Sequence, residues 1–235
     1  MIQVSDLSFS VIAPKMKTKF LVYDVETTGL LPRGNKYSMP IEEYPHIIQL
    51  SFAIYDYETK KIVWEYDSYV KLDNVDIPEK ITNITGITKE ICETRGNPMH
   101  EVLEKFYEAY MFCEGLVAHN MDFDEKMIKI ELERNRPILM KTAPHCFMTF
   151  NEMYENVHGI DRYCTMKKGT DLCDLTLEAR DGRPAKKKWP KLVQLYEHLF
   201  PNQKVNGFHN SLVDVKACLR CYLKMRHNYD DKNII

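Results

Sequence analysis

The sequence of 235 residues is 44% hydrophobic, which is enough for one globular core and marginal for two, so we expect a single domain. The formal net charge of -2 and a pI near 6.5 exclude a globally basic surface, so a polyanionic partner must be held by a local patch or by metal ions. No stretch approaches a membrane span or a signal peptide, and the seven cysteines are odd in number and scattered. We therefore expect an intracellular protein, in the cytoplasm or nucleus, with free thiols.

Three strands are predicted near the start of the chain. The apolar run over 19–25 is typical of a buried strand, and 46–56 and 61–72 predict two further strands joined by a polar turn over 57–60. Consecutive strands joined by short turns pair in antiparallel fashion, so this segment predicts a three-stranded meander.

Helices and strands alternate in the next part of the chain. Apolar residues recur at helical spacing over 99–112, and a short predicted strand over 115–120 leads into a helix over about 123–135. Residues 143–148 are compatible with another strand. Residues 150–188 are polar, with few periodic apolar positions, and they predict no regular element.

Two helices are predicted towards the end, one within 189–200 and a last one from residue 211. Antiparallel strands followed by alternating strands and helices predict an α/β fold with a mixed sheet flanked by helices. We expect one domain over 19–228, with the polar stretch inserted in it, an N-terminal extension over 1–18 and a tail over 229–235.

The segment YDVETTG places two carboxylates at the end of the first strand. Side chains at i and i+2 of a strand share a face, so Asp24 and Glu26 converge on one spot. Such carboxylates repel each other unless they share a proton, which suits acid-base catalysis, or bind a divalent cation, which suits phosphate chemistry. A solvent-facing pair at a strand end is the alternative without a function.

Two later segments carry further acids and two histidines. In AHNMDFDEKM, His119 and Asn120 follow a predicted strand, and Asp124 lies in the first turn of a helix. In FHNSLVDVKAC, His209 stands five residues before Asp214, in the first turn of the last helix. With the first acidic pair, and in this order, these segments resemble the three motifs of the DnaQ-like (DEDDh) 3'-to-5' exonuclease family.

The resemblance covers about residues 19–226 and implies a ribonuclease H-like fold with a metal-dependent site. Four acids without cysteine or imidazole make an oxygen-only ligand set, which favours Mg²⁺ or Mn²⁺ over zinc. Two such ions can hold the attacking and leaving oxygens of a phosphoryl displacement. By resemblance, Asp24, Glu26 and Asp214 hold the ion beside the nucleophilic water. Asp24 also contacts the second ion, on which Asp124 acts.

Two histidines compete for the role of general base, because His119 and His209 each stand five residues before an aspartate. The resemblance assigns the base to His209, which takes a proton from water and needs a pKa near the working pH. It assigns His119 a supporting role through hydrogen bonds. Asp122 lies beside the second motif but outside its acidic position, so a solvated or capping role is expected.

Residues after the first acidic pair are predicted to bind the 3'-terminal nucleotide. Family members meet this nucleotide with backbone donors and an apolar wedge, and a glycine permits a close backbone approach. The segment NITGIT, residues 83–88, resembles the family segment His-Gly-Ile-Thr with a threonine in place of the histidine. The predicted substrate-binding residues are Thr27, Thr28, Gly29, Leu30, Thr85 and Asn120.

Two other segments have both a functional and a structural interpretation. Residues 186–189 combine a basic run with an aromatic, a pairing that follows a phosphate backbone and stacks a base. A solvated loop with Trp189 packed ahead of the helix explains the pattern equally well. The proline-rich loop over 32–45 either lies over the site or forms a surface insertion.

Together these features predict a metal-dependent 3'-to-5' exonuclease that hydrolyses phosphodiester bonds at nucleic-acid 3' ends and releases nucleoside 5'-monophosphates. The expected partners are single-stranded or frayed 3' ends, with DNA favoured over RNA, and a DNA polymerase or replication complex in a proofreading role. Two alternatives stay open. One is a non-catalytic module that binds 3' ends or docks on a polymerase, and the other is an endonuclease or integrase on the same sheet.

Overall fold

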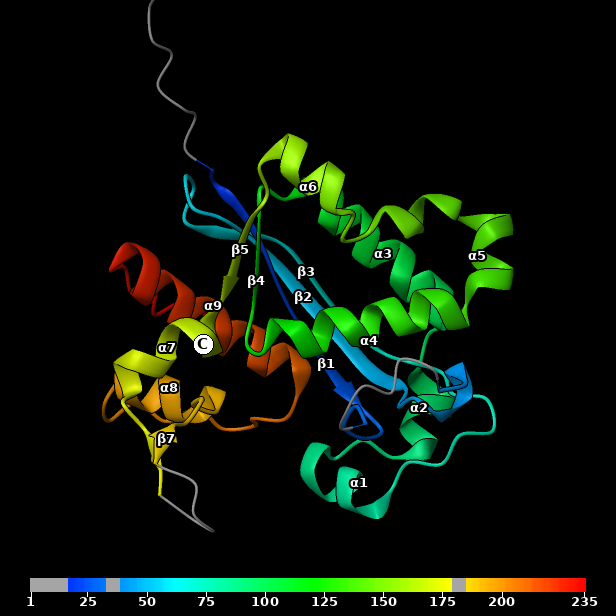
Figure 1. Ribbon diagram of the computed structural model, residues 1–235, viewed down its shortest axis with the longest axis horizontal. Helices are drawn as coiled ribbons and strands as arrows, with labels where there is room; N and C mark the ends of the chain where they lie inside the picture. Colours follow the sequence, from blue (N-terminus) through cyan, green and yellow to red (C-terminus); the bar gives the residue numbers. More distant parts are fainter. Residues whose placement is uncertain (1–16, 33–38, 179–184) are drawn as a thin grey trace, which may run out of the picture.

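A mixed sheet organises the chain in the computed structural model, which describes residues 17–32, 39–178 and 185–235 (Figure 1). Within these ranges the main sheet has five strands in the order β3-β2-β1-β4-β5. The meander pairs β1 with β2 and β2 with β3 in antiparallel fashion, while β4 is parallel to both β1 and β5. The α/β fold class is confirmed. The strands are β1 Lys19–Thr27, β2 Ile47–Asp56, β3 Lys61–Tyr69, β4 Gly115–Ala118 and β5 Asp161–Cys164.

Burial along the strands explains their places in the sheet. All ten residues of β2 are buried, as expected for a strand with neighbours on both sides and helices on both faces. The exposure of β3 alternates along most of its length, which fits an edge strand with one solvated face. The three strands and the polar turn between β2 and β3 are therefore confirmed.

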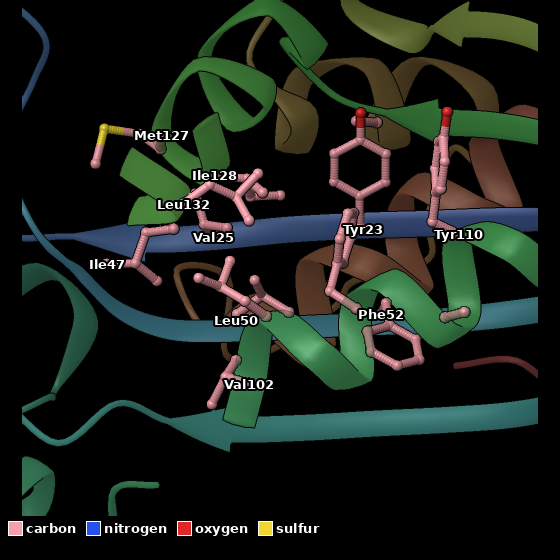
Figure 2. Close-up of a cluster of buried hydrophobic side chains, with 14 of the residues drawn as sticks. Tyr23, Val25, Ile47, Leu50, Phe52, Val102, Tyr110, Met127, Ile128 and Leu132 are labelled. Atoms are coloured by element: carbon pink, nitrogen blue, oxygen red, sulfur yellow. The ribbon is translucent and has the colours of Figure 1, made fainter. Parts of the chain in front are cut away.

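One face of the sheet packs against α3 and α4 (Figure 2). Tyr23 and Val25 of β1 point to this face, and meet Val102 of α3 and Ile128 of α4 in one buried cluster. The predicted helices over 99–112 and 123–135 are confirmed, although the second begins two residues earlier. The helical segments on this side and at its ends are η1 Ile41–Glu43, α1 Glu79–Thr85, α2 Lys89–Arg95, α3 Met99–Phe112, α4 Met121–Arg134, α5 Arg136–Thr142, η2 Pro144–Met148 and α6 Glu152–His158.

The opposite face packs against α9, with α8 beside it. Phe20 and Val22 of β1 belong to this second cluster, together with Leu195 of α8 and Leu219 of α9. Because side chains alternate along a strand, the even-numbered residues of β1 face α9 and the odd-numbered ones face α3 and α4. The next even-numbered residues of β1 are the predicted acidic pair. The elements on this side are α7 Thr165–Cys173, α8 Leu192–Leu199 and α9 Ser211–His227.

The region 143–188 holds more regular structure than its sequence predicts. The strand considered over 143–148 is wrong, because Pro144 begins the 3-10 helix η2, where its fixed φ and missing N–H are tolerated. The polar stretch supplies β5, the edge strand of the main sheet, as well as α6 and α7. It also supplies a small ribbon of β6 Thr176–Leu177 and β7 Lys186–Lys187. Residues 179–184 lie outside the described part.

The last residues of the chain pack back onto the domain. The Tyr55 hydroxyl donates a hydrogen bond of 2.9 Å to Asp231, and Ile234 is buried in the cluster beside α9. Arg220 of α9 is buried and donates to Asp230 at 2.7 Å and to Gln203 at 2.7 Å. The predicted tail over 229–235 is thus attached to the domain, whereas residues 1–16 of the predicted extension lie outside the described part.

The sequence also predicts free cysteines and no membrane-spanning segment. All seven cysteines are free, as predicted. Among the helices of the described ranges, none combines the length and apolar character that crossing a membrane requires.

Replacement of Phe106 by alanine tests the core between α3 and the sheet. Its ring is fully buried and lies 5.3 Å from Tyr23 and 5.7 Å from Phe150, measured between ring centroids. We expect Phe106→Ala to lower the free energy of unfolding by about 3–5 kcal/mol, as for other buried aromatics. Urea denaturation followed by circular dichroism measures this loss.

The matched control lies on the same helix, since Phe112 is 52% exposed. Phe112→Ala is expected to change the free energy of unfolding by about 0.5 kcal/mol or less. Equal losses for the two variants would contradict the assignment of the core.

Candidate active site

The first acidic pair lies where β1 meets the N-terminus of α9. Asp24 and Glu26 continue the even-numbered face of β1, beyond the apolar residues that pack on α9. The Ser211 hydroxyl donates 2.7 Å to the Asp24 carbonyl oxygen, and the Ser211 amide donates 3.2 Å to the side chain of Gln49 on β2. These two bonds fix the start of α9 against the strand that bears the acids.

Asp124 reaches the same place from α4. It lies in the first turn of the helix and is 2% exposed, and its Oδ1 accepts a hydrogen bond of 3.3 Å from the Val25 amide. Its Oδ2 is buried and has no hydrogen-bond partner among the described residues. Asn120, at the N-cap, has φ 67°, a left-handed conformation that asparagine tolerates better than most residues, and this turn directs the chain from β4 into α4.

Asp214 approaches from the first turn of α9. The Asn210 side chain caps this helix by accepting from the Val213 amide at 3.3 Å. Asp214 Oδ2 accepts 3.2 Å from the His209 amide, whereas its buried Oδ1 lacks a partner among the described residues. His209 is exposed and has φ 70°.

Three predicted site residues form a close set. A carboxylate oxygen of Glu26, one of Asp214 and a ring nitrogen of His209 all lie within 4.8 Å of one another. Asp24 and Asp124 stand outside this set, but the charges of Glu26 and Asp214 raise the pKa values of both. The structure therefore brings all four acids and His209 to one end of the sheet. The His209 imidazole lies beside the carboxylates, although the predicted ligand set contained only oxygen atoms.

Burial raises the pKa values of all four acids, and repulsion between the carboxylates adds to the rise for Asp24, Glu26 and Asp124. Loss of solvation, with repulsion from Asp214, raises the pKa of Glu26 to about 8, and loss of solvation raises the pKa of Asp214 to about 7. The pKa of Asp24 is raised well above its usual value, first by burial and then by the charges of Asp124 and Asp214. The pKa of Asp124 is likewise raised, mainly by burial.

This arrangement fits a bound cation. Asp124 and Asp214 each have a buried carboxylate oxygen to which no described residue donates, and such oxygens are costly unless a positive charge satisfies them. A divalent ion between the acids would also relieve the repulsion that raises their pKa values. The carboxylate oxygens of this site favour hard ions such as magnesium and manganese.

Hydrogen bonds inside the protein occupy both ring nitrogens of His119, so this histidine is a poor candidate for a general base. Its Nδ1 lies 3.0 Å from the Thr165 hydroxyl, and its Nε2 lies 3.1 Å from the Pro190 carbonyl oxygen. A carbonyl only accepts, so Nε2 carries the proton and Nδ1 accepts from Thr165. Burial lowers the pKa of His119 to about 4, which keeps the ring neutral. These contacts agree with a structural role.

The predicted nucleotide-binding turn is partly committed to internal bonds. The Thr27 hydroxyl donates 2.7 Å to the Gly29 carbonyl, and the Thr28 hydroxyl accepts 2.9 Å from the His46 amide. Leu30 is 84% exposed. No atom of the described residues lies within 4 Å of the position that a Cβ on Gly29 would take, so these residues leave the space beside this backbone open. Leu30 and Gly29 therefore face solvent.

Two other predicted positions have internal partners. The Thr85 hydroxyl, at the end of α1, donates 3.0 Å to the Ile81 carbonyl and accepts 3.1 Å from the Ile87 amide. Asp122 forms an ion pair of 2.7 Å with Lys167 on α7, so its expected solvated role is compatible with the structure.

The proline-rich loop meets α4 rather than the acids in its described part. The Arg134 guanidinium, in the last turn of α4, donates 3.0 Å each to the carbonyl oxygens of Ile41 and Tyr44. A pocket of about 600 Å³ lies between the loop and α4, and it extends to Asp122 in the first turn. Residues 33–38, at the tip of the predicted loop, lie outside the described part.

Sequence reasoning missed a buried polar chain behind the acids. Gln49 is fully buried, and its amide donates 2.8 Å to Asp67 while its oxygen accepts from Ser211. Ser51 donates 2.7 Å to the same Asp67 carboxylate. The signal was present, because Gln49 and Ser51 interrupt an apolar strand, and a buried polar side chain requires a partner.

Comparison with known proteins adds the family context. The exonuclease family model RNase_T matches residues 21–222. The 3'-5' exonuclease DinG of Bacillus subtilis is 33% identical over 121 residues, which are 50% of this chain and 11% of that protein. The PolC-type DNA polymerase III of Mycoplasmopsis pulmonis is 30% identical over 111 residues, 47% of this chain and 7% of that protein. The chain thus spans a small part of the length of these relatives.

Solved structures of exonuclease I resemble the fold. The zinc-bound E. coli exonuclease I in complex with single-stranded DNA matches with a TM-score of 0.60 and 17% identity, over 91% of this chain and 42% of that chain. Exonuclease I from Methylocaldum szegediense matches with a TM-score of 0.55 and 17% identity, over 90% of this chain and 41% of that chain. At this identity the likeness concerns the fold, which is ribonuclease H-like.

The acidic site makes the metal-free protein sensitive to pH. Glu26 and Asp214, with folded-state pKa values raised to about 8 and about 7, bind more protons in the folded state than in the unfolded state. Their stabilising contribution is complete below the unfolded pKa and is lost as the pH rises through the folded pKa. His46 and His119, whose pKa values are lowered to about 4, make stability rise with pH instead, but this rise ends at about pH 6.5. We expect the melting temperature in excess chelator to fall from about pH 6.5 to about pH 8.

Replacement of the Glu26 carboxyl group by a carboxamide tests whether this residue contributes to the fall in melting temperature. Glu26→Gln removes one titrating group and is expected to reduce the fall in melting temperature. The exposed Asp73 serves as the control, and Asp73→Asn is expected to keep the full fall. A wild-type melting temperature that rises over this interval would refute the electrostatic description of the site.

Proposed function

Because the chain belongs to the RNase_T exonuclease family, whose members are DnaQ-like, we propose that it is a metal-dependent 3'-to-5' exonuclease that releases nucleoside 5'-monophosphates. The observation that carries this proposal is the convergence of four carboxylates and His209 at the ends of β1, α4 and α9. Two of these carboxylates keep a buried oxygen to which no described residue donates, which supports metal binding at the same place.

The acids would hold the metal from three elements. Asp24 and Glu26 approach from β1, and Asp214 from α9. Asp124 approaches from α4 and contributes its free Oδ2. Bound Mg²⁺ or Mn²⁺ supplies positive charge to the phosphate that is attacked and to the oxygen that leaves. The rigid first turns of α4 and α9 hold their acids ready, so little reorganisation is required when the ion binds.

His209 is the proposed general base. Its ring nitrogen lies beside the Glu26 and Asp214 carboxylates, and its exposed ring reaches solvent, from which the attacking water comes. The imidazole takes a proton as the water oxygen attacks phosphorus. The bond between phosphorus and the 3' oxygen of the preceding nucleotide breaks, and that oxygen takes up a proton. The products are a nucleoside 5'-monophosphate and a strand shortened by one nucleotide with a free 3'-hydroxyl.

The open surface beside the end of β1 supports a preference for the 3' ends of nucleic acids. Leu30 projects into solvent immediately after the acidic strand, and the backbone at Gly29 is open to a ligand. We assign Leu30 to wedge the terminal base and Gly29 to approach the terminal sugar. The Thr27 and Thr28 hydroxyls would act indirectly, because they already hold the turn. The Thr85 hydroxyl is likewise bonded within α1, so a direct role in binding falls more naturally to Asn120.

Comparison supports DNA as the substrate and a polymerase as a partner. The relatives include the exonuclease DinG, a PolC-type DNA polymerase III and a DNA polymerase III epsilon-like protein of Rhodobacter capsulatus. Exonuclease I, with a similar fold, has been solved with single-stranded DNA. Action on single-stranded or frayed DNA ends, with proofreading beside a polymerase or replication complex as one role, is accordingly part of the proposal. A pure binding module is disfavoured, since it has no use for four acids that repel one another.

The direct test uses a 5'-labelled single-stranded DNA and the RNA of the same sequence. With Mg²⁺ or Mn²⁺ we expect a ladder that shortens from the 3' end in single-nucleotide steps, faster for DNA. Chelator abolishes the ladder because the acids then lack the charge that stabilises the transition state. Asp214→Ala abolishes it while the circular dichroism spectrum is kept, whereas Asp73→Ala, at an exposed site, leaves the rate unchanged.

Other products would favour the alternatives. Cleavage of a circular strand would identify an endonuclease. Binding of 3' ends without cleavage under all metal conditions would identify a binding module.

The two histidines are distinguished by rate. We expect His209→Ala to lower kcat by about two to four orders of magnitude, the range for loss of a general base. His119→Ala is expected to cost less, because both ring nitrogens of His119 are bonded inside the protein. A larger loss of kcat for His119→Ala would reverse the assignment.

A further inference from the structure

A short ribbon of β6 and β7 lies beside α7 and α8, at the edge of the molecule (Figure 1). Leu177 pairs with Lys186 and Thr176 with Lys187, and the Lys188 amide extends the pairing by donating 2.7 Å to the Leu175 carbonyl. We call residues 175–177 and 185–189 the basic ribbon. It contains three consecutive lysines followed by a tryptophan.

The two faces of the basic ribbon differ in charge balance. Lys187 turns towards α7, where its Nζ lies 2.6 Å from Asp171 and 3.6 Å from Asp174. Because side chains alternate along a strand, Lys186 and Lys188 share the other face, and Leu177 lies opposite Lys186 on it. Across the described ranges, neither Lys186 nor Lys188 has an acidic side chain within ion-pair distance. Among the described residues, this outer face therefore carries positive charge without an acidic partner.

An exposed apolar surface accompanies this charge. Trp189 is 60% exposed and Leu177 is 43% exposed. The structural interpretation of the sequence requires Trp189 to pack ahead of α8. The exposure of its side chain argues against that packing. Alternation places Trp189 on the side of Lys187, and a large aromatic held in water directly after the lysine run suits the stacking of an unpaired base.

The basic ribbon is joined to the acidic end of the sheet. The carbonyl of Pro190, the residue after Trp189, accepts the 3.1 Å hydrogen bond from His119. His119 directly precedes Asn120, the N-cap of the helix that bears Asp124. The base of the ribbon therefore lies at the strand end that leads into the acidic site.

We propose that the basic ribbon binds the single-stranded nucleic acid that leads into the active site, with Lys186 and Lys188 on phosphates and Trp189 stacked on a base. The proposal rests on the proposed exonuclease function. Charge complementarity supports it, because the chain has a net charge of -2 and gathers four acids at the site, so a polyanion requires cations close by. Base stacking on tryptophan tolerates every sequence, as an exonuclease requires.

The salt dependence of binding tests the two lysines. The protein in excess chelator is titrated against a fluorescein-labelled oligothymidylate by fluorescence anisotropy over a series of NaCl concentrations. Each phosphate contact contributes about 0.7 to the slope of log K against log salt for a single strand. The double variant Lys186→Ala/Lys188→Ala is expected to reduce that slope by about 1.4. The control double variant Lys61→Ala/Lys141→Ala, at exposed sites on β3 and α5, is expected to keep it.

Stacking is tested separately at the aromatic. Trp189→Ala is expected to weaken binding of the oligothymidylate by between about fivefold and about a hundredfold, and Trp189→Phe to restore most of the affinity. An unchanged slope for the lysine variant, or an equal change in the control variant, overturns the proposal. Unchanged affinity in Trp189→Ala overturns the stacking part.

A small substrate separates this proposal from the proposed function. The p-nitrophenyl ester of thymidine 5'-monophosphate reports on the active site alone, because it is too short to reach the ribbon. We expect the ratio of kcat/KM for the oligothymidylate to kcat/KM for the ester to fall in the ribbon variants. Absence of hydrolysis of both substrates by the wild type would refute the exonuclease function, while the anisotropy slopes would still decide whether the ribbon binds the strand.

Discussion

The attachment of the N-terminus of α9 to the two central strands is the constraint on which the site depends. Ser211 bonds the Asp24 carbonyl through its hydroxyl and the Gln49 side chain through its amide, and Asp67 holds the other end of Gln49. Since Asp214 follows Ser211 within one helical turn, the same bonds set the separation between the acids of β1 and α9. Removal of the Ser211 hydroxyl or of the Gln49 side chain would leave a buried polar group without its hydrogen bond, at a cost of about 1–3 kcal/mol.

Much of the fold follows from local pattern. The apolar run of β1, the long β2 and the helical periodicity of α3 and α9 extend over enough residues to identify each element, and two-residue periodicity alone places Asp24 and Glu26 together. Short elements are different. In β5, four residues with two charges form a strand because β4 offers a free edge, and η2 over 144–148 is helical because of Pro144. Such segments take their conformation from neighbours distant in sequence.

The acids of the candidate site could be predicted, but the supporting contacts could not. Spacing treats His119 and His209 alike, and only the structure shows that both ring nitrogens of His119 are bonded internally. The approach of the His209 nitrogen to Glu26 depends on a bend of the backbone that no sequence pattern records. Gln49 stands out in an apolar strand, yet its meaning appears only when Ser211 is seen beside it.

Two residues beside the acids, Asn120 and His209, have left-handed backbones with φ 67° and 70°. This conformation costs a residue with a Cβ about 1 kcal/mol, and glycine would adopt it without that cost. Glycine at 209 would, however, remove the imidazole. Thermal stability and the proposed role of His209 therefore make opposite demands on this position, so directed evolution for heat resistance alone would favour variants that have lost the imidazole.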